Sequence, residues 1–242
     1  MNKIDTNNLP KHIGIIMDGN GRWAKTKGKL RLFGHKNGVK AVRETVEMSA
    51  QIGVKFLTLY AFSTENWSRP KSEVKSLMRL LISSINSETK TLLKNNIKLK
   101  SIGDTNLLPQ DAKEQLNSSI EKTKNNNRMT LILALSYSGR WDIISAVKKI
   151  IKHKITSDKI DEQLFEQYLS TKNVPNPELL IRTSGEYRIS NFLLWQSAYS
   201  EFYFTDTLWP DFRKSDLEKA IIDFQSRERR FGNTVEQKNQ AC

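Results

Sequence analysis

Hydrophobic residues along the chain form two kinds of segment that alternate from one end to the other. Short apolar runs, such as residues 12–17 and 54–62, are rich in β-branched and aromatic side chains and give way to polar turn residues, which is typical of buried strands. Longer segments such as residues 71–94 repeat apolar side chains every three or four positions, which predicts amphipathic helices. Further strands are expected at residues 97–102, 129–137, 178–182, 192–195 and 201–204, and further helices at residues 36–51, 109–124, 141–153, 161–170 and 214–229.

This alternation predicts an α/β fold with a mostly parallel central sheet that helices cover on both faces. The 242 residues contain neither a linker nor an internal repeat, so we expect one domain over residues 1–242, with flexible termini at residues 1–10 and 233–242. Ligands bind such sheets beyond the carboxyl ends of the strands. Candidate chemistry is therefore expected in the segments that directly follow strands.

The composition is that of an ordinary globular protein. Hydrophobic residues make up 38% of the chain, with only 11 Gly and 6 Pro, which excludes disordered, collagen-like and low-complexity classes. The longest wholly apolar run, residues 131–135, is far shorter than the roughly 20 residues of a membrane span, and no signal peptide is visible. The single cysteine, Cys242, cannot form an intramolecular disulfide. We expect a soluble cytoplasmic protein.

The chain carries 39 Lys and Arg against 26 Asp and Glu, a formal net charge of +13. Such an excess attracts polyanions, which include nucleic acid, anionic lipid and phosphate esters. The arginines that follow the predicted strands stand singly beside glycines, tryptophans and carboxylates, which favours a site for a small polyanion. A basic nucleic-acid-binding protein is the alternative, although no nucleic-acid-binding motif is visible.

The first strand ends in a glycine turn, residues 19–24, that fits the pattern G-x-G-x-x-G/A of dinucleotide-binding proteins. Asp18 directly precedes the turn and would repel a bare pyrophosphate, so a turn needed only for backbone geometry is an equal alternative. A third interpretation gives a role to Asp18 as well as to the turn and the basic residues near it. The backbone N–H groups of the turn bind a diphosphate, Arg22, Arg31 and His35 add charged hydrogen bonds, and Asp18 holds a bridging Mg²⁺.

Residues 182–190 form a second candidate anion site. Two arginines and a serine flank a glycine turn in this segment. A solvated loop is the alternative, but Arg182 ends an apolar strand, where an unpaired charge would be costly. Two diphosphate sites in one chain suggest a reaction that joins two diphosphate esters.

Residues 63–69 follow the second strand and open the longest helix, a position suited to a mobile lid. Asn66 could instead be a helix cap, and Trp67 a core anchor. The helix that follows carries an apolar stripe that favours a core position. The stripe could equally line a tunnel that holds an apolar tail, since each buried CH₂ contributes roughly 0.8 kcal/mol. The stripe consists of Leu77, Met78, Leu81 and Ile85.

Few side chains suit a metal site. The three histidines are scattered, no Cys/His cluster or P-loop is present, and no two aspartates are adjacent. If Mg²⁺ binds, we expect Asp18 to be its first protein ligand and Glu201 the second.

Four motifs, together with residues 201–230, resemble the cis-prenyltransferase family and cover nearly the whole chain. They read HIGIIMDGNGRWAKTKGKLRLFGH at residues 12–35, TLYAFSTENWSRP at 58–70, GRWDI at 139–143 and IRTSGEYRISNFLLWQ at 181–196. The resemblance implies a homodimeric α/β enzyme with an apolar tunnel, which uses Mg²⁺ to add isopentenyl diphosphate units to farnesyl diphosphate with cis double bonds. The implied product is a long cis-polyprenyl diphosphate, undecaprenyl diphosphate, from which the lipid carrier of cell-wall synthesis is made.

The resemblance also implies roles for individual residues. Asp18 would be the catalytic and Mg²⁺-binding carboxylate, Asn66 the proton acceptor and Glu201 a further Mg²⁺ ligand. Residues 230–232 would reach the site of the partner subunit. The allylic diphosphate would contact Gly19, Asn20, Gly21, Arg22, Trp23, Arg31 and His35. The mobile loop would contribute Ser63, Thr64, Glu65, Asn66, Trp67 and Arg69, and isopentenyl diphosphate would contact Arg182, Arg188, Ile189 and Ser190.

The sequence departs from the family at three serines. Ser184 replaces a glycine of R-T-G-G-E, and Ser136 and Ser138 replace residues of N-Y-G-G-R-W. We expect these small replacements to leave activity intact, with a different backbone geometry at Ser184. Side chains at the far end of the tunnel, among them Ala61 and Met129, are expected to set product length. Part of the positive charge is expected to hold the protein peripherally on an anionic membrane, where a lipid product is delivered.

Overall fold

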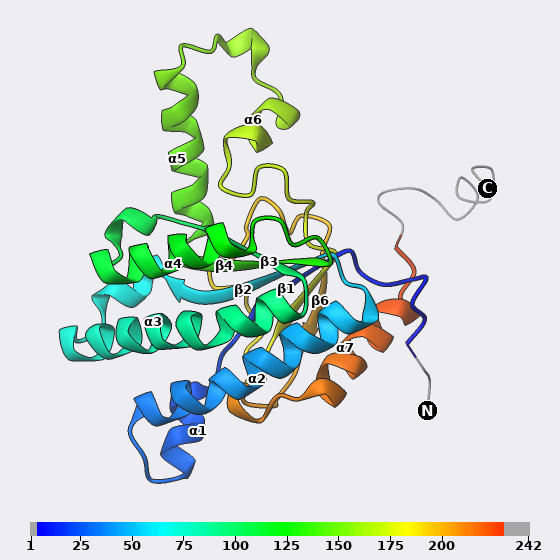
Figure 1. The fold of residues 1–242 in the computed structure, drawn as a ribbon. Coiled ribbons are helices and arrows are strands. Elements are labelled where there is room, and N and C mark those ends of the chain that lie inside the picture. The colour runs from blue at the N-terminus through cyan, green and yellow to red at the C-terminus, as the bar shows by residue number, and fades with distance from the viewer. Residues whose placement is uncertain (1–3, 230–242) are drawn as a thin grey trace.

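Six parallel strands form one sheet at the centre of the structure, a computed structural model that describes residues 4–229 (Figure 1). The strands lie in the order β3-β4-β2-β1-β5-β6, which confirms the predicted α/β fold. The strands are β1 (His12–Ile16), β2 (Phe56–Ser63), β3 (Ile97–Ile102), β4 (Met129–Tyr137), β5 (Leu179–Arg182) and β6 (Glu201–Phe204). The helices are α1 (Asn20–Thr26), α2 (Arg31–Ile52), α3 (Lys71–Lys94), α4 (Gln110–Thr123), α5 (Gly139–Lys152), α6 (Glu162–Tyr168) and α7 (Lys214–Ser226).

The chain begins in the middle of the sheet and builds it outward in both directions. β1 pairs with β2 on one side and with β5 on the other, so the connections diverge at the carboxyl end of β1. Open α/β sheets bind ligands in the crevice at such a switch point. Ile16 is level with Arg182 in this register, and Asp18 therefore lies beside the end of β5.

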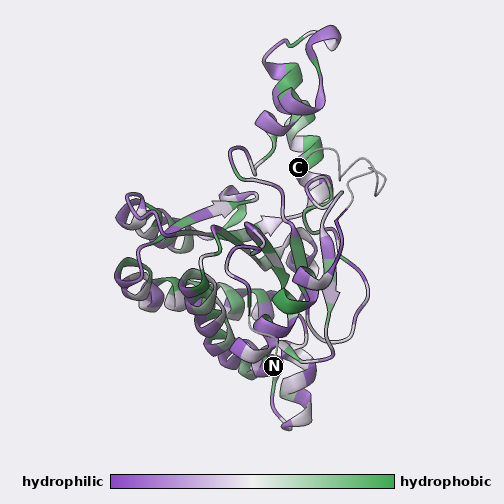
Figure 2. Cartoon of the chain, turned by 90° about the vertical axis from the view of Figure 1, so that its right-hand side faces the viewer, coloured by the Kyte–Doolittle hydropathy of each residue, from purple (hydrophilic) through white to green (hydrophobic). Residues whose placement is uncertain are grey.

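Helices cover the two faces of the sheet unequally. α2, α3, α4 and α7 pack on one face around a core that includes Ile13, Leu57 and Met78. In Figure 2 these helices carry hydrophilic residues on their outer surface and hydrophobic residues toward the sheet. The other face is covered by residues 189–193, with Phe192 fully buried, and by the first turn of α5. α5 then extends away from the sheet with α6 beside it (Figure 1).

Two segments differ from the sequence prediction. α2 begins at Arg31 although its predicted range starts at residue 36, because glycines obscure its first turns. These glycines serve a close contact: a Cβ at Gly34 would lie 1.9 Å from the carbonyl oxygen of Asn20. The predicted strand at residues 192–195 is wrong, since these residues form bends and turns. Leu193 is fully buried and has a φ of 47°, so the apolar run supplies a core contact outside any extended strand.

The N-terminal segment is joined to α7. Gln225 Nε2 donates to the carbonyl oxygens of Asp5 and Asn8 at 2.6 and 2.9 Å. Residues 1–3 and 230–242 lie outside the described residues, and this includes the segment 230–232 that was expected to reach a partner subunit.

Candidate active site

A cavity of about 280 Å³ lies between α2, α3 and the sheet. Its polar end is lined by Asp18, Arg31, His35 and Arg69, which follow or face the carboxyl ends of β1 and β2. A polar mouth over an apolar interior suits an amphiphile with an anionic head and a hydrocarbon tail. The apolar wall contains the whole predicted stripe and includes Val39, Val42, Val46, Leu59, Ala61, Leu77, Met78, Leu81, Ile85, Leu133 and Leu135. Ala61 lines the cavity but lies near the carboxyl end of β2, close to the polar mouth, whereas Met129 is buried in the main core.

Asp18 lies at the centre of the polar end. Its Oδ1 accepts a hydrogen bond from the backbone N–H of Gly19 at 2.6 Å, and its Oδ2 accepts one from Arg182 Nη2 at 2.8 Å. Arg22 Nη2 lies 3.6 Å from the same Oδ2. The backbone N–H of Asp18 donates to Thr183 Oγ1 at 2.9 Å, which fixes the residue between β1 and β5.

The pKa of Asp18 lies below the ordinary value of an aspartate. Burial opposes ionisation, but the hydrogen bonds from Arg182 and the Gly19 N–H, with the charges of Arg182 and Arg22, outweigh it. The side chain keeps 33% of its surface exposed. Asp18 therefore presents an ionised carboxylate at neutral pH with surface left for a ligand.

Arg182 is the buried cation of the site, with 3% of its surface exposed. Besides its bond to Asp18, it donates through Nη1 to the carbonyl oxygen of Arg188 at 2.5 Å and to Ser190 Oγ at 2.7 Å. Its Nε is buried without a hydrogen-bond partner among the described residues. The guanidinium thus ties the loop after β5 to Asp18, and one buried donor remains for a ligand.

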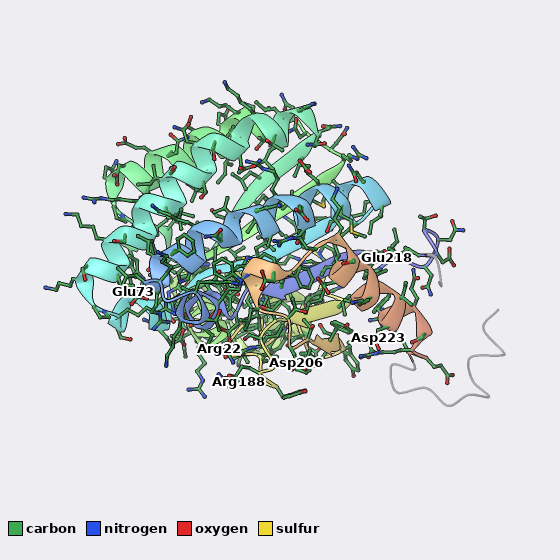
Figure 3. The ribbon with its side chains drawn as sticks, turned by 90° about the horizontal axis from the view of Figure 1, so that it is seen from below. Arg22, Glu73, Arg188, Asp206, Glu218 and Asp223 are labelled. Carbon is green, nitrogen blue, oxygen red and sulfur yellow. The ribbon has the colours of Figure 1, made fainter. Side chains whose placement is uncertain are left out.

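Glu186 joins the two basic segments. Its carboxylate lies 3.2 Å from Arg22 Nη1 and forms a short contact with Arg188. Figure 3 shows both arginines on the same face of the molecule. Arg22 also donates to Ser184 Oγ at 2.5 Å, and Ser184 has a φ of 80°. This left-handed backbone suits glycine, so the serine of this chain carries strain and adds a hydrogen bond to Arg22.

A second carboxylate, Glu73, lies between two further arginines of the polar end. Its Oε1 is 3.7 Å from Arg31 Nε and 3.2 Å from Arg69 Nη1. Burial, together with the positive charges of Arg69 and Arg31, lowers the pKa of His35 to about 4. His35 is therefore neutral at pH 7 and can gain a proton when an anion offsets its neighbours' charge.

The loop after β2 forms a short 3-10 helix, Thr64–Ser68. Asn66 Oδ1 accepts a hydrogen bond from the N–H of Ser63 at 3.1 Å, which is a capping role. Trp67 packs against the main core, and its Nε1 donates to Ser136 Oγ at 2.9 Å. The structure thus shows both structural alternatives, cap and anchor, and Asn66 lines the cavity as well.

Hydrogen bonds connect this loop with the segments after β4 and β5. Glu65 Oε1 accepts from Asn191 Nδ2 at 2.8 Å. Asn191 Oδ1 in turn accepts from the N–H of Arg140 at 2.9 Å. Ser138 Oγ caps α5 by accepting from the N–H of Trp141 at 3.2 Å. Ile189 packs in the smaller core beneath the same segment. The segments that follow β2, β4 and β5 are thereby held as one structure around the mouth.

The glycine turn after β1 is shaped by close contacts. Gly19 has a φ of 103°, and a Cβ there would lie 2.9 Å from Ser184 Cβ. A Cβ at Gly21 would lie 3.0 Å from Arg31 Nε, so the glycine lets this arginine lie over the start of α1. Asn20 Oδ1 is buried without a hydrogen-bond partner among the described residues. The turn therefore brings an arginine and an unpartnered acceptor to the cavity.

Glu201 lies apart from Asp18. It is paired with Leu179 at the amino end of β6, whereas Arg182 is level with Phe204. The three residues between these levels span ~10 Å of strand. The carboxylate of Glu201 accepts a hydrogen bond from Arg227 Nη1 at 2.9 Å. The structure therefore does not bring the two expected Mg²⁺ ligands together within one chain.

Asp18 and Asn20 offer oxygen ligands that fit Mg²⁺. The ion is commonly held by one or two carboxylates, several waters and the phosphate oxygens of a substrate. Asp18 supplies an ionised and partly exposed carboxylate, and Asn20 supplies an unpartnered carbonyl oxygen that lines the same cavity. No cluster of three or more His, Cys, Asp or Glu side chains suited to a metal occurs within residues 4–229. The residues present could hold Mg²⁺ together with a diphosphate.

The sequence patterns do not assign roles to Glu73, Glu186 and Thr183. A signal exists for Glu73, which stands four residues after Arg69, a spacing that predicts an ion pair on a helix. Glu186 stands inside the second basic segment, where a carboxylate among arginines is unusual for a simple anion site. Thr183 has no sequence signal, since its hydroxyl acts only because β1 and β5 are neighbours.

Known proteins resemble this chain over nearly its whole length. Residues 16–232 match a family described as "Putative undecaprenyl diphosphate synthase". An isoprenyl transferase of Chlorobaculum tepidum is 56% identical over 95% of this chain and 88% of that protein. A farnesyl-diphosphate-specific ditrans,polycis-undecaprenyl-diphosphate synthase of Pasteurella multocida is 52% identical over 98% of this chain and the whole of that protein.

Two solved structures share the fold. Lavandulyl diphosphate synthase from Lavandula x intermedia, in complex with dimethylallyl diphosphate, has a TM-score of 0.90 and 39% identity, covering 93% of this chain and 99% of that one. A structure described as a probable undecaprenyl diphosphate synthase from Campylobacter jejuni has a TM-score of 0.78 and 34% identity, covering 96% of this chain and 100% of that one. The similarity therefore includes every segment that forms the site.

Proposed function

Because the chain belongs to the undecaprenyl diphosphate synthase family of cis-prenyltransferases, we propose that it extends farnesyl diphosphate by repeated condensation with isopentenyl diphosphate. Its product is a long cis-polyprenyl diphosphate of the undecaprenyl type. One observation carries the proposal: two groups of arginines flank Asp18 at the mouth of an apolar cavity. The first group is Arg22 and Arg31, beside the glycine turn, and the second is Arg182 and Arg188, at and after the end of β5. Each group suits one diphosphate, and the cavity suits the growing tail.

The reaction joins two carbon atoms at this mouth. The C–O bond of the allylic substrate breaks, its diphosphate leaves with the electron pair, and the double bond of isopentenyl diphosphate attacks the allylic cation. Loss of a proton then forms the new cis double bond. Arg22 and Arg31, beside the glycine turn, stabilise the negative charge that grows on the leaving diphosphate. The apolar wall keeps water from the cation.

The second diphosphate is assigned to the loop after β5. Arg188 is largely exposed there and Arg182 holds an unpartnered buried N–H, so both can donate to isopentenyl diphosphate. Ser190, whose hydroxyl accepts from Arg182, lies in the same loop. This placement puts the second substrate next to Asp18, where the new bond forms.

Mg²⁺ is the proposed cofactor and Asp18 its proposed ligand. When bound, the ion would withdraw negative charge from the diphosphate oxygens of the allylic substrate. Asp18 contributes an ionised carboxylate that Arg182 holds in place. Glu201, bonded to Arg227 at the amino end of β6, is a weaker choice for a second ligand than its sequence position suggests.

A diphosphate oxygen is proposed as the proton acceptor. The resemblance assigns this role to Asn66, but a carboxamide is a very weak base, and its Oδ1 already accepts a hydrogen bond from Ser63. The diphosphate of isopentenyl diphosphate is a stronger base near the same carbon atom. Asn66 is then left to shape the loop and to contact a diphosphate.

The protein is proposed to act as a homodimer joined through α5. This helix extends from the body of the molecule (Figure 1), and its residues Ile144, Val147 and Ile151 expose 54%, 40% and 69% of their surface. Their spacing places them on one stripe, which a second copy of the helix would cover. Sedimentation velocity of the Ile151→Glu variant should show monomers where the unmodified protein sediments as a dimer.

The remaining partners follow from the site and the product. No helix within residues 4–229 is both long and apolar enough to cross a membrane. We place the protein in the cytoplasm, with peripheral contact at the inner face of the membrane, because its proposed product is a lipid. Nucleic acid is not a proposed partner, since the site arginines share carboxylates around a cavity instead of forming a stripe.

An elongation assay tests the proposed function. Purified protein, Mg²⁺, farnesyl diphosphate and labelled isopentenyl diphosphate should give butanol-extractable products, which chromatography then sizes. A reaction without farnesyl diphosphate is the control and should give almost no label in the extract. A folded protein that makes no labelled long-chain product would refute the proposal. Duplex DNA binding that weakens steeply with salt would then favour the nucleic-acid alternative.

A further inference from the structure

The positive charge of the chain is concentrated in one short segment. Residues 19–43 contain eight Lys and Arg and no Asp or Glu, whereas the whole chain has a net charge of +13. The segment comprises α1, the turn that follows it and the first half of α2. Within residues 4–229, four of these cations form ion pairs: Arg22, Arg31 and Arg43 with carboxylates of other segments, and Lys40 with Glu44 in the next turn of α2. Lys25 in the last turn of α1, and Lys27 and Lys29 on the turn that follows, are all exposed.

The same turn carries an apolar side chain that the fold does not bury. Leu30, directly after Lys29, exposes 84% of its surface, more than any other large hydrophobic residue among those described. A Cβ built at Gly28 would meet no atom within 4 Å, so the turn is open to its surroundings. Figure 1 shows α1 and its turn standing out from the body of the molecule. Packing therefore gives no reason for a leucine at this tip.

The turn nonetheless has a defined conformation, because side chains pack beneath it. Trp23 of α1 stacks on Phe33 of α2 with ring centroids 5.7 Å apart and an interplanar angle of 20°. Lys27 Nζ lies 5.8 Å from the centre of the Trp23 ring. This stacking joins the two helices beneath the tip. It therefore holds the backbone of Leu30 and its neighbouring lysines in one orientation. A rigid tip can insert without first paying the entropy of ordering a loop.

Exposed lysines around an exposed leucine fit the surface of an anionic bilayer. Lysines near such a surface are attracted to the lipid headgroups, and an apolar side chain gains by entering the boundary of the acyl chains. Nucleic acid would use the lysines but would leave Leu30 in water. We propose that residues 25–30, the end of α1 and the turn before α2, dock the protein on an anionic lipid bilayer.

Docking at this turn brings the membrane to the mouth of the cavity. Arg31, the residue after Leu30, lines the polar end of the cavity, and Gly21 of the neighbouring helix lines it too. The product's diphosphate and the lipid headgroups would then lie at one level. This last step rests on the proposed function, since it requires a lipid product, but docking itself does not require activity.

Vesicle sedimentation at low salt tests the docking surface with the full chain. The probes are vesicles of equal parts phosphatidylcholine and phosphatidylglycerol, compared with vesicles of phosphatidylcholine alone. The unmodified protein should bind only the anionic vesicles. Leu30→Ser should weaken this binding about tenfold, and Lys25→Gln with Lys29→Gln about 30-fold.

A matched control comes from the end of α3 that lies away from this turn. Leu93 exposes 43% of its surface near the end of α3, with Lys90 and Lys94 beside it. The combined variant Leu93→Ser, Lys90→Gln and Lys94→Gln should bind the anionic vesicles as the unmodified protein does. If this variant loses as much binding as the turn variants, attraction is unspecific and the proposal is overturned.

Other outcomes also decide the matter. Failure of the unmodified protein to bind anionic vesicles overturns the proposal, and so does unchanged binding by the turn variants. If Leu30→Ser binds normally and duplex DNA displaces the vesicles, the turn is a polyanion surface and membrane docking is wrong. Elongation in detergent solution is measured in parallel and should be unchanged in all variants. A protein that docks but does not elongate would refute the proposed function and leave the docking surface standing.

Discussion

The two arginine groups at the mouth of the cavity differ in how far the protein fixes them before a substrate binds. Arg182 at the end of β5 is nearly buried, and both of its terminal nitrogens donate to groups of the protein. Arg22 and Arg31, beside the glycine turn, expose 49% and 59% of their side chains. One cation is therefore part of the fold, and the others are held at its surface.

The carboxylates around these arginines account for the difference. Glu186 lies between Arg22 and Arg188, and Glu73 lies between Arg31 and Arg69. Each carboxylate relieves the repulsion between two cations, and a diphosphate with its greater charge can take its place. The buried arginine thus sets the geometry beside Asp18, while the exposed arginines supply affinity.

The largest effect is expected at Asp18, which joins the two groups. Asp18→Asn keeps an acceptor for Arg182 but removes the charge that would hold Mg²⁺, so turnover in the elongation assay should fall about 10³-fold or more. The nearly buried Arg182 loses its anionic partner, so the free energy of unfolding should also fall, by about 2 kcal/mol, and thermal unfolding checks that the variant stays folded at the assay temperature. A variant that keeps a tenth of the original turnover would show that Asp18 is not the catalytic carboxylate.

Arg182 and Arg188 give the sharpest contrast within one loop. Arg182→Met removes a buried cation and leaves Asp18 without its partner, which should lower the free energy of unfolding by about 2 kcal/mol, less than for a fully buried pair because Asp18 is partly exposed. Activity should fall about 100-fold as well. Arg188→Gln is the control and should weaken isopentenyl diphosphate binding without a change in thermal unfolding. Equal unfolding temperatures for both variants would contradict the distinction between fixed and adjustable cations.

Arg22 should affect affinity alone. Arg22→Gln removes one charged hydrogen bond to the allylic diphosphate, which should raise the KM for farnesyl diphosphate about tenfold or more. Thermal unfolding should stay the same, since half of the side chain is exposed and its ion pairs are worth little. Steady-state kinetics with each substrate varied in turn checks the assignment. A rise confined to the KM for isopentenyl diphosphate would place Arg22 in the other group.

The smallest expected effect is a proton taken up by His35. Its pKa of about 4 leaves the imidazole neutral in the free protein at pH 7. A bound diphosphate offsets the charges of Arg31 and Arg69 and raises this pKa, so binding should tighten as the pH falls from 7 toward 5, by at most about tenfold per pH unit. Calorimetric titration with farnesyl diphosphate in two buffers of different ionisation enthalpy measures the proton uptake. His35→Gln is the control, because protonation of the diphosphate itself is common to both proteins, and equal uptake would exclude the histidine.

Much of this site could be predicted from the sequence because single segments carry it. Asp18 and its glycine turn follow an apolar strand, and Arg182 ends another, so the rule that parallel strands share a carboxyl edge brings them together. The same local reasoning gives the apolar stripe of α3, although the stripe alone could not distinguish core from cavity wall. The structure shows that it is both.

The parts that could not be predicted depend on contacts between distant segments. Glu186 forms an ion pair with Arg22, which lies 164 positions earlier in the chain, and no local sequence pattern indicates that the two residues are close in space. Residues 192–195 have the composition of a strand but form bends and turns, from which Phe192 and Leu193 enter the smaller core. Apolar side chains can be buried from an irregular backbone as well as from a strand. Glu201 begins a strand as expected, yet the register of that strand places it at the opposite end from Asp18.

The central claim is that two unlike groups of arginines hold two diphosphates at once around Asp18. Equilibrium dialysis tests it with labelled isopentenyl diphosphate and a thio analogue of farnesyl diphosphate whose C–S bond does not ionise. In the presence of Mg²⁺ and saturating analogue, each chain should still bind one labelled isopentenyl diphosphate, and Arg188→Gln should weaken only this second event. Displacement of the label by the analogue would show a single shared diphosphate site and would contradict the account.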